Sequence, residues 1–156
     1  MNDGVRIERA ELHDLARLSE IAFAAKAYWE YPAEWLEEWR PQLTISESDL
    51  SGGMAFKLTA QATILGFYIL REDGEKLWLE HLWLDPSSIG NGFGRRLFEH
   101  AMATAKDQGH SKVSIESDPN AEGFYAAMGA ARVGESRSEL DGKTRILPLM
   151  EFKLEE

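Results

Sequence analysis

The sequence predicts a mixed α/β domain in which helices pack against both faces of one mostly antiparallel sheet. The 156 residues, 44% of them hydrophobic, suit a single domain with a substantial core, so we expect residues 1–156 to form one unit. Helical and strand periodicities alternate in the order β-α-α-β-β-β-α-β-α-β-β. No repeat or Pro/Ser-rich linker interrupts this order.

The first elements are a strand and two helices. Residues 5–10 indicate a short strand, and apolar residues spaced by three and four positions predict a helix over residues 11–27. Pro32 stands at a favoured first-turn position for the second helix, and Pro41 is expected to end it.

Three strands follow, and we expect them to form an antiparallel meander. They occupy residues 55–61, 63–72 and 76–84. Asp73-Gly74 marks a tight turn before the last of them, and Asp85-Pro86 stops it.

The rest of the chain contains two helices and three strands. A helix runs to about Gln108, with Gly109 as its cap, and the next strand, at residues 112–117, is expected to lie parallel to the strand at 76–84 because a helical crossover joins them. The last predicted elements are a helix over 121–128 ending at Gly129 and two strands over 131–139 and 145–155, joined by Asp141-Gly142.

Composition excludes several functions. The net charge of −10 argues against a nucleic-acid partner, because phosphate backbones need clustered Lys and Arg. The absence of cysteine excludes disulfides, thiolate zinc sites and a cysteine nucleophile. No apolar run approaches the ~18 residues of a membrane span, and the polar N-terminus is unlike a secretion signal, so we expect a cytoplasmic protein. No metal is expected, since no ligand-like spacing relates the four histidines, His13, His81, His100 and His110.

Residues 88–98 read SIGNGFGRRLF, with Gly90, Gly92 and Gly94 just before a helix. Backbone N–H groups at a helix N-terminus favour an anion, and glycine lets the backbone approach it closely. A dinucleotide site would need Gly or Ala where Arg95 stands, and a P-loop would need a Gly-Lys-Ser/Thr that is absent. On its own, the segment therefore predicts either an anion site at a helix start or a plain turn.

The chain resembles the GNAT superfamily of acetyl-CoA-dependent N-acetyltransferases over nearly its whole length. The resemblance lies in the element order, the strand end HLWLDP, the glycine loop and the later segment DPNAEGFYAAMGA. In the family's loop pattern, Gln/Arg-x-x-Gly-x-Gly/Ala, Gly92 and Gly94 fill the two small positions, whereas Ile89 stands where Gln or Arg is usual. This departure affects one side-chain contact and leaves the backbone amides unchanged.

The resemblance implies acetyl-CoA as cosubstrate, with its pyrophosphate on the loop and its pantetheine arm paired with the preceding strand. The family often has an Asn seven residues before its tyrosine. That position is Asp118 here, and Asn120 lies two residues later. Either of them could contact the cofactor, and Asn120 could instead cap a helix. The cofactor-binding residues implied are Leu82, Trp83, Leu84, Gly90, Asn91, Gly92, Phe93, Gly94, Arg95 and Asn120.

The implied reaction is direct attack of a primary amine, from a small molecule or a peptide N-terminus, on acetyl-CoA in a ternary complex. It needs a neutral amine, a polarised thioester carbonyl and a proton for the leaving thiolate. The resemblance implies Tyr125 as the general acid, whereas a structural tyrosine would only pack its helix on the sheet.

Three residues are candidates for the base: Glu80, His81 and Glu116. Each lies on an otherwise apolar strand, where a titratable group seldom persists without a partner. Glu80 is favoured because some family members carry a catalytic Glu in this region. Strand alternation predicts that Glu80 and His81 face opposite sides of the sheet.

The aromatic segment at residues 26–39, KAYWEYPAEWLEEW, has several interpretations. Its rings could fill the core or contact a second copy in a homodimer. The resemblance implies instead one wall of the acceptor site, including Trp29 and Tyr31, which would suit an organic cation because Glu34, Glu37 and Glu38 lie beside it. Glu116 is a further candidate for binding the acceptor. Two other functions stay open on the same fold: a non-catalytic acyl-CoA sensor and an acyltransferase with a non-amine acceptor.

Overall fold

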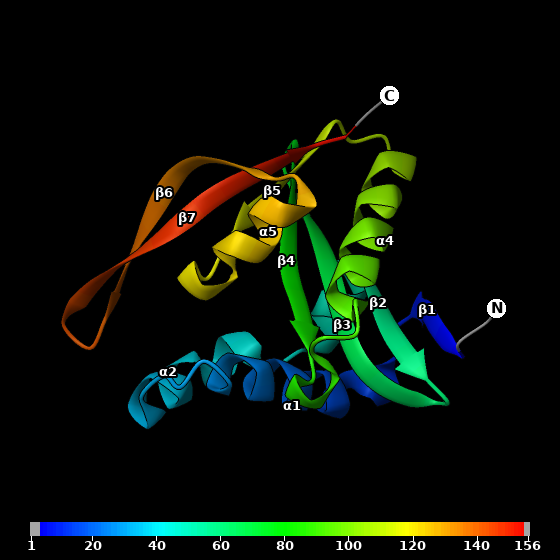
Figure 1. The fold of residues 1–156 in the computed structure, drawn as a ribbon, viewed down its shortest axis with the longest axis horizontal. Helices are drawn as coiled ribbons and strands as arrows, with labels where there is room; N and C mark the ends of the chain where they lie inside the picture. Colours follow the sequence, from blue (N-terminus) through cyan, green and yellow to red (C-terminus); the bar gives the residue numbers. More distant parts are fainter. Residues whose placement is uncertain (1–3, 155–156) are drawn as a thin grey trace.

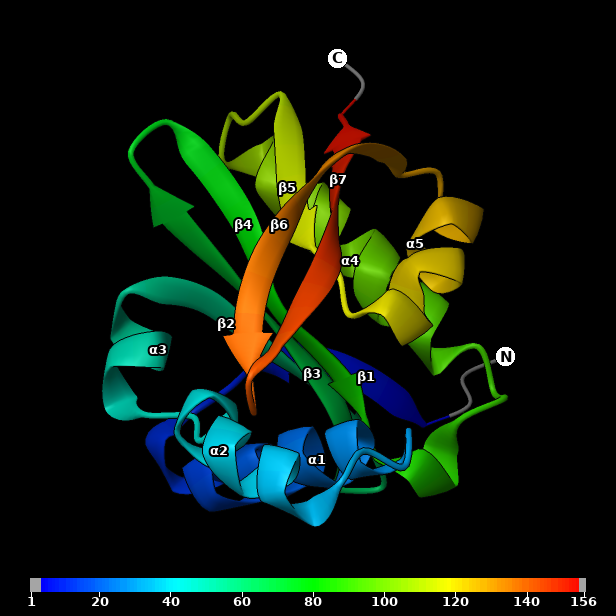
Figure 2. The ribbon, with the colours of Figure 1, turned by 90° about the vertical axis from the view of Figure 1, so that its left-hand side faces the viewer.

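A computed structural model describes residues 4–154. Its centre is a seven-stranded sheet with strand order β1-β2-β3-β4-β5-β7-β6 (Figures 1 and 2). All neighbouring strands are antiparallel except β4 and β5, which are parallel as expected. The strands are β1 (Val5–Arg9), β2 (Gly53–Ala60), β3 (Thr63–Asp73), β4 (Lys76–Leu84), β5 (Lys112–Glu116), β6 (Ala131–Leu140) and β7 (Lys143–Lys153).

Helices cover both faces of this sheet, which confirms the expected fold class. Figures 1 and 2 show α1 and α2 side by side, apart from α4 and α5. Among residues 4–154, no helix is both long and apolar enough to cross a membrane. The helices are α1 (Leu15–Ala27), α2 (Ala33–Leu43), α3 (Glu47–Ser51), α4 (Phe93–Asp107) and α5 (Glu122–Met128), with 3-10 turns η1 (Leu12–Asp14), η2 (Pro86–Ser88) and η3 (Pro119–Ala121).

Alternate residues of β3 contribute to two separate cores. Phe67 and Ile69 are buried with residues of α1 and α2, whereas Tyr68 and Leu70 are buried with residues of α4. Successive side chains of a strand point to opposite faces, so one strand serves both layers. The almost unbroken apolar run of this strand follows from that position.

Three sequence expectations need correction. Pro41 lies inside α2, which ends at Leu43, because a proline in the last turn removes only one backbone donor from the helix. Helix α3 was not predicted, since its single turn is too short to show a period. The last strand begins at Lys143 rather than residue 145, and its predicted last residue, 155, lies outside the described residues.

The sheet separates between β4 and β5. The register of this parallel pair contains a single partnership, between Trp78 and Ser114, in the described part of the chain. Beyond it, the end of β4 up to Leu84 has main-chain groups with no β5 partner.

A β-bulge distorts β4 just after that pair. Ile69 of β3 is opposite His81, but the next residue, Leu70, is opposite Leu79, so Glu80 is an extra residue. The prediction that Glu80 and His81 face opposite sides is wrong, because the bulge interrupts the alternation at this point.

Candidate functional site

The glycine-rich loop leads directly into α4. Gly90 and Gly92 have φ values of +94° and +78°, a region that residues with side chains rarely adopt, and Gly92 is the N-cap residue. The first N–H groups of α4 therefore lack a side-chain cap and are available to an anion. Gly94 has another role, because a Cβ there would lie 3.2 Å from the Phe124 ring.

Two side chains of this loop, Asn91 and Arg95, make contacts within the protein. Asn91 donates its Nδ2–H to the Ser88 carbonyl at 3.1 Å and so braces the loop internally. Arg95 is exposed and lies 3.7 Å from Glu99 on its own helix. Its guanidinium is free to meet a phosphate, since an exposed pair of this kind is weak.

An apolar cavity of about 270 Å³ lies beside the loop. Residues from the end of β4, the start of α4 and α5 line it together with the end of α1. Trp29, predicted as part of the acceptor wall, lies here instead. The lining comprises Ala25, Tyr28, Trp29, Leu82, Trp83, Leu84, Ile89, Gly94, Asn120, Ala121, Phe124 and Tyr125.

Tyr125 is buried in the wall of the apolar cavity. Its hydroxyl makes no hydrogen bond to another residue in the 4–154 range. Burial, with a smaller contribution from Asp118, raises the pKa of Tyr125 well above its usual value, so the phenol stays protonated. It can donate to a ligand atom in the cavity.

A larger polar cavity of about 550 Å³ adjoins the apolar one at Trp83, which lines both. Glu80 and His81 both line the polar cavity, as the bulge allows. Its lining comprises Lys26, Glu38, Trp39, Gln42, Leu43, Glu80, His81, Trp83, Glu116, Asp118, Arg137, Ser138, Glu139, Leu140, Arg145 and Leu147.

A buried ion pair joins two sides of the polar cavity. The Lys26 ammonium contacts the Asp118 carboxylate, and the two side chains are 13% and 7% exposed. Burial alone would raise the pKa of Asp118, but Lys26 and several hydrogen bonds hold it below its usual value. Asp118 also accepts the Asn120 backbone N–H at 2.8 Å, so Asp118 caps this turn and Asn120 does not.

Tyr31 belongs to the same network, behind the wall of the cavity. Its hydroxyl donates to Asp118 at 2.9 Å and accepts from Asn120 and Arg145 at 2.9 and 3.0 Å. Burial, followed by Asp118, raises the pKa of Tyr31 to about 12. The predicted acceptor residue Tyr31 is therefore held by the protein's own groups.

The protein's cations also occupy the predicted aromatic wall. Lys26 Nζ lies 4.4 Å from the centroid of the Trp39 ring, and the Arg145 guanidinium lies 4.9 Å from it. Tyr31 and Trp39 pack edge to face at 4.9 Å. Of the interpretations of this segment, internal packing describes these rings.

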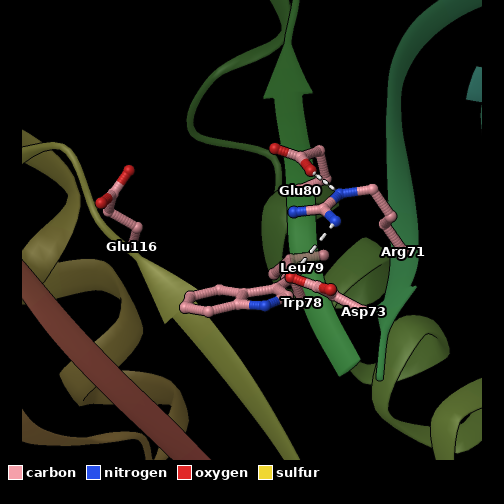
Figure 3. Close-up of a pocket in the computed structure, with 6 residues that line it drawn as sticks. All are labelled: Arg71, Asp73, Trp78, Leu79, Glu80 and Glu116. Carbon is pink, nitrogen blue, oxygen red and sulfur yellow. Dashed lines mark hydrogen bonds and ion pairs between the residues drawn. The ribbon is translucent and has the colours of Figure 1, made fainter. Parts of the chain in front are cut away.

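The candidate bases differ in their partners. Glu80 forms an ion pair with Arg71, and Glu116 accepts the Ser136 hydroxyl at 2.6 Å. Figure 3 shows that these carboxylates come from neighbouring strands, with the Trp78 ring between β4 and β5. Both also line a smaller cleft of about 250 Å³, so they stand where it borders the polar cavity.

His81 is held by a neighbouring side chain. Trp83 Nε1 donates a hydrogen bond to His81 Nδ1 at 2.9 Å. Burial lowers the pKa of His81, and Glu80 and Asp49 oppose this only in part.

Sequence reasoning missed two largely buried cations of the polar cavity, Lys26 and Arg145. Lys26 stands on the first predicted helix and Arg145 on the last predicted strand, and neither belongs to a recognisable motif. The burial of Lys26 and Arg145 and their proximity to Asp118 arise from the tertiary fold, so no local pattern in the sequence identifies these two residues.

The fold, the glycine-rich loop and two adjoining cavities beside the separated end of β4 suit a group transferase. The chain belongs to the acetyltransferase (GNAT) family, whose match covers residues 12–130. The expected family is therefore confirmed, and acetyl transfer is the activity that its name describes.

Individual relatives agree with this membership. Peptidyl-lysine N-acetyltransferase YjaB of Salmonella typhimurium is 36% identical over 93 residues, which is 60% of this chain and 59% of that protein. The match thus spans about three fifths of the curated relative. A GCN5-related N-acetyltransferase from Rhodopseudomonas palustris has a similar fold, with a TM-score of 0.81 at 20% identity over 96% of this chain and 95% of that one. The PaiA N-acetyltransferase of Thermoplasma acidophilum, solved with coenzyme A, has a TM-score of 0.72 at 22% identity, covering 98% and 99%.

Proposed function

We propose that the protein transfers the acetyl group of acetyl-CoA directly to a primary amine of a small molecule or peptide in a ternary complex. The observation that carries this proposal is the meeting of the apolar and polar cavities at Trp83, beside the separated end of β4. A thioester held in one cavity is then open to attack from the other, without a covalent enzyme intermediate.

The donor would be bound mainly by the backbone. The pyrophosphate meets the N–H groups of residues 90–95, and the pantetheine arm pairs with residues 82–84, whose main chain has no β5 partner. Asn120, on the rim of the apolar cavity, contributes a side-chain amide. Arg95 adds charge at the loop.

Two protein groups serve the transfer: one receives the amine proton and the other stabilises the departing sulfur. The amine nitrogen attacks the thioester carbon, the C–S bond breaks, and the amine proton passes to Glu80, directly or through a water. Tyr125 donates a hydrogen bond to the departing sulfur. A tyrosine has a higher pKa than a thiol, and burial raises the pKa of Tyr125 further. A hydrogen bond from the phenol to the sulfur therefore costs less free energy than complete transfer of the phenol proton.

The acceptor is proposed to be a lysine side chain of a peptide or a small primary amine. Support comes from the name of the Salmonella relative, a peptidyl-lysine N-acetyltransferase, and from the carboxylates of Glu80 and Glu116 at the cavity. Glu116 would bind the acceptor, whereas Trp29, in the apolar cavity, would contact the acyl-CoA side. Action in the cytoplasm stays a prediction.

Two measurements test the proposal. Calorimetric titration with acetyl-CoA should show binding, and the absence of both heat and thermal stabilisation at millimolar ligand would remove it. Thiol release should then follow from lysine peptides or small amines. Binding without thiol release on any amine would identify a non-catalytic acyl-CoA sensor, and release with alcohols alone would identify a non-amine acceptor.

A further inference from the structure

The hydrogen bond from Trp83 to His81 determines which histidine nitrogen carries a proton. An indole N–H only donates, so His81 Nδ1, 2.9 Å away, must present its lone pair to it. Neutral His81 therefore carries its proton on Nε2. Protonation of Nδ1 would give the imidazolium and would place an Nδ1–H against the indole N–H. The contact with Trp83 therefore disfavours the charged form of His81.

The other nitrogen opens into the polar cavity. His81 lines that cavity, and no buried side-chain nitrogen or oxygen of the described residues lacks a hydrogen-bond partner. Within residues 4–154, His81 makes one hydrogen bond, through Nδ1, so its Nε2 is not enclosed. The charged groups acting on the ring are Glu80 of β4 and Asp49 of α3.

We propose that Trp83 is a positioning residue that fixes His81 as a neutral hydrogen-bond donor in the acceptor cavity. His81 then binds a carbonyl or carboxylate oxygen of the acceptor through Nε2–H and takes no proton from the amine. This inference rests on the proposed function for the identity of the cavity, and it leaves proton removal to a carboxylate.

Nitrogen NMR of 15N-histidine protein tests the tautomer without any activity. The spectrum should show His81 with a bare Nδ1 and a protonated Nε2 on both sides of histidine's ordinary pKa of about 6.5. His81→Gln identifies the signals by their loss. In Trp83→Phe, His81 should become a mixture of tautomers. A protonated Nδ1 in the wild-type protein, or an unchanged tautomer in Trp83→Phe, would overturn the assignment.

Kinetics separate a donor from a base. Glutamine keeps an N–H donor and cannot titrate, so kcat/KM of His81→Leu should fall about tenfold below that of His81→Gln, the effect of roughly one hydrogen bond. The acidic limb of kcat/KM should be present in both the wild type and His81→Gln. Its loss in His81→Gln would make His81 the base, and NMR agreement without any turnover would count against the proposed function alone.

A separate observation concerns β6, which forms one edge of the sheet. Leu140 and Lys143 flank the two-residue turn to β7, and their backbone N–H and C=O groups bond to each other. Along an antiparallel hairpin, such hydrogen-bonded pairs alternate with pairs that are not hydrogen-bonded. The N–H and C=O groups of odd-numbered β6 residues therefore point away from β7. Consistent with this, Pro148, opposite Glu135, turns its carbonyl away from β6 and accepts from Ser117 at 2.8 Å.

Charges alternate along this free edge, at Glu135, Arg137 and Glu139. When two copies pair antiparallel along β6, each odd-numbered residue must lie opposite an odd-numbered residue of the partner, because only these direct their backbone groups toward it. The two-fold axis then passes through a residue of β6 and not between two residues. Centring on Glu135 or Arg137 opposes like charges, whereas centring on Ser136 sets Glu135 against the partner's Arg137 twice. Centring on Ser138 also sets Arg137 against the partner's Glu139 twice, but it shortens the overlap and opposes Glu135 to the partner's Asp141.

We propose that a second copy of this chain pairs along β6, centred on Ser136, to form a two-fold dimer. Charged edges block most strand partners, but this pattern complements itself. The exposed side chain of Val133, 57% accessible, lies within the same strand and would be covered at the ends of the pairing.

Sedimentation equilibrium of charge-reversal variants tests this pairing. Glu135→Arg and Arg137→Glu should each raise the dimer dissociation constant about tenfold, by opposing like charges. The double variant exchanges the charges and should restore dimerisation to within about threefold of the wild type. A wild-type monomer at all concentrations, or a double variant as weak as the single ones, would overturn the proposal.

Discussion

The apolar and polar cavities share Trp83 but are built differently. The apolar cavity draws most of its wall from two short stretches, residues 82–94 and 120–125, with main-chain groups and glycine conformations at the loop. The polar cavity draws side chains from both ends of the chain, from Lys26 to Leu147. A site made of contiguous backbone leaves a motif in the sequence, whereas a site made of scattered side chains does not.

The largest effect should come from the polar side, with Asp118→Asn. This change leaves the Lys26 ammonium buried without its counter-charge, so the free energy of unfolding should fall by about 3–5 kcal/mol in urea denaturation. Asp14→Asn is the matched control, since it breaks another buried pair, with Lys57 at 2.8 Å, away from both cavities. Only Asp118→Asn should raise the KM of the acceptor, and equal acceptor KM values would contradict a role for this pair in the site.

The same pair gives an acid dependence with a defined sign. The pKa of Asp118 is lower in the folded than in the unfolded protein, where it is about 3.9. Its contribution to stability is therefore complete above the unfolded value and is lost as pH falls through the folded one. Denaturation midpoints measured at decreasing pH should fall less steeply for Asp118→Asn than for the wild type.

Tyr125→Phe probes the wall of the apolar cavity. Removing the hydroxyl should lower kcat about 100-fold, because the departing sulfur loses a hydrogen bond to a charged group worth about 1.5–3 kcal/mol. The affinity for acetyl-CoA should change little because the ring still fills its place. Stopped assays at saturating acetyl-CoA measure this. An unchanged kcat would leave Tyr125 with a packing role only.

Gly92→Val tests the backbone construction of the cofactor side. Valine at φ +78° is strained by about 1–2 kcal/mol and obstructs the approach of an anion, so the KM for acetyl-CoA should rise about tenfold or more. Gly142→Val imposes similar strain at φ +73° in the β6–β7 turn and should cost stability without raising that KM. A similar rise in the KM for acetyl-CoA in both variants would contradict an anion-binding role for the loop.

The smallest effect should follow Arg95→Ala. This exposed side chain, 3.7 Å from Glu99, should change acetyl-CoA affinity by about threefold, with a lower salt dependence in titrations at two ionic strengths. A loss beyond tenfold would mean that side-chain charge, and not backbone, dominates binding at the loop.

Most of the fold was predictable from the sequence because each strand and long helix carries its own period. The strand at residues 76–84 was predicted with its observed limits, since turn residues stand at both ends. The bulge in that strand was not predictable, because KLWLEHLWL fits an unbroken strand equally well and the extra residue appears only in its pairing with β3. The order of Glu80 and His81 in the sequence thus gave a misleading orientation.

The site divides in the same way. The glycine loop was identified because φ values near +80° demand glycine, which the sequence displays. Lys26 and Arg145 were missed because they meet over Trp39 only after helix α1 and strand β7 have packed. The prediction that Tyr31 receives a substrate cation depended on an aromatic face that these cations cover.

The single Trp78–Ser114 partnership between β4 and β5 bears on how such a protein can diversify. Changes of length or register in the β6–β7 hairpin act beyond this junction and leave the ladder from β1 to β4 intact. Under the proposed function, acceptor choice can therefore change during evolution while the glycine loop keeps the backbone geometry that favours an anion.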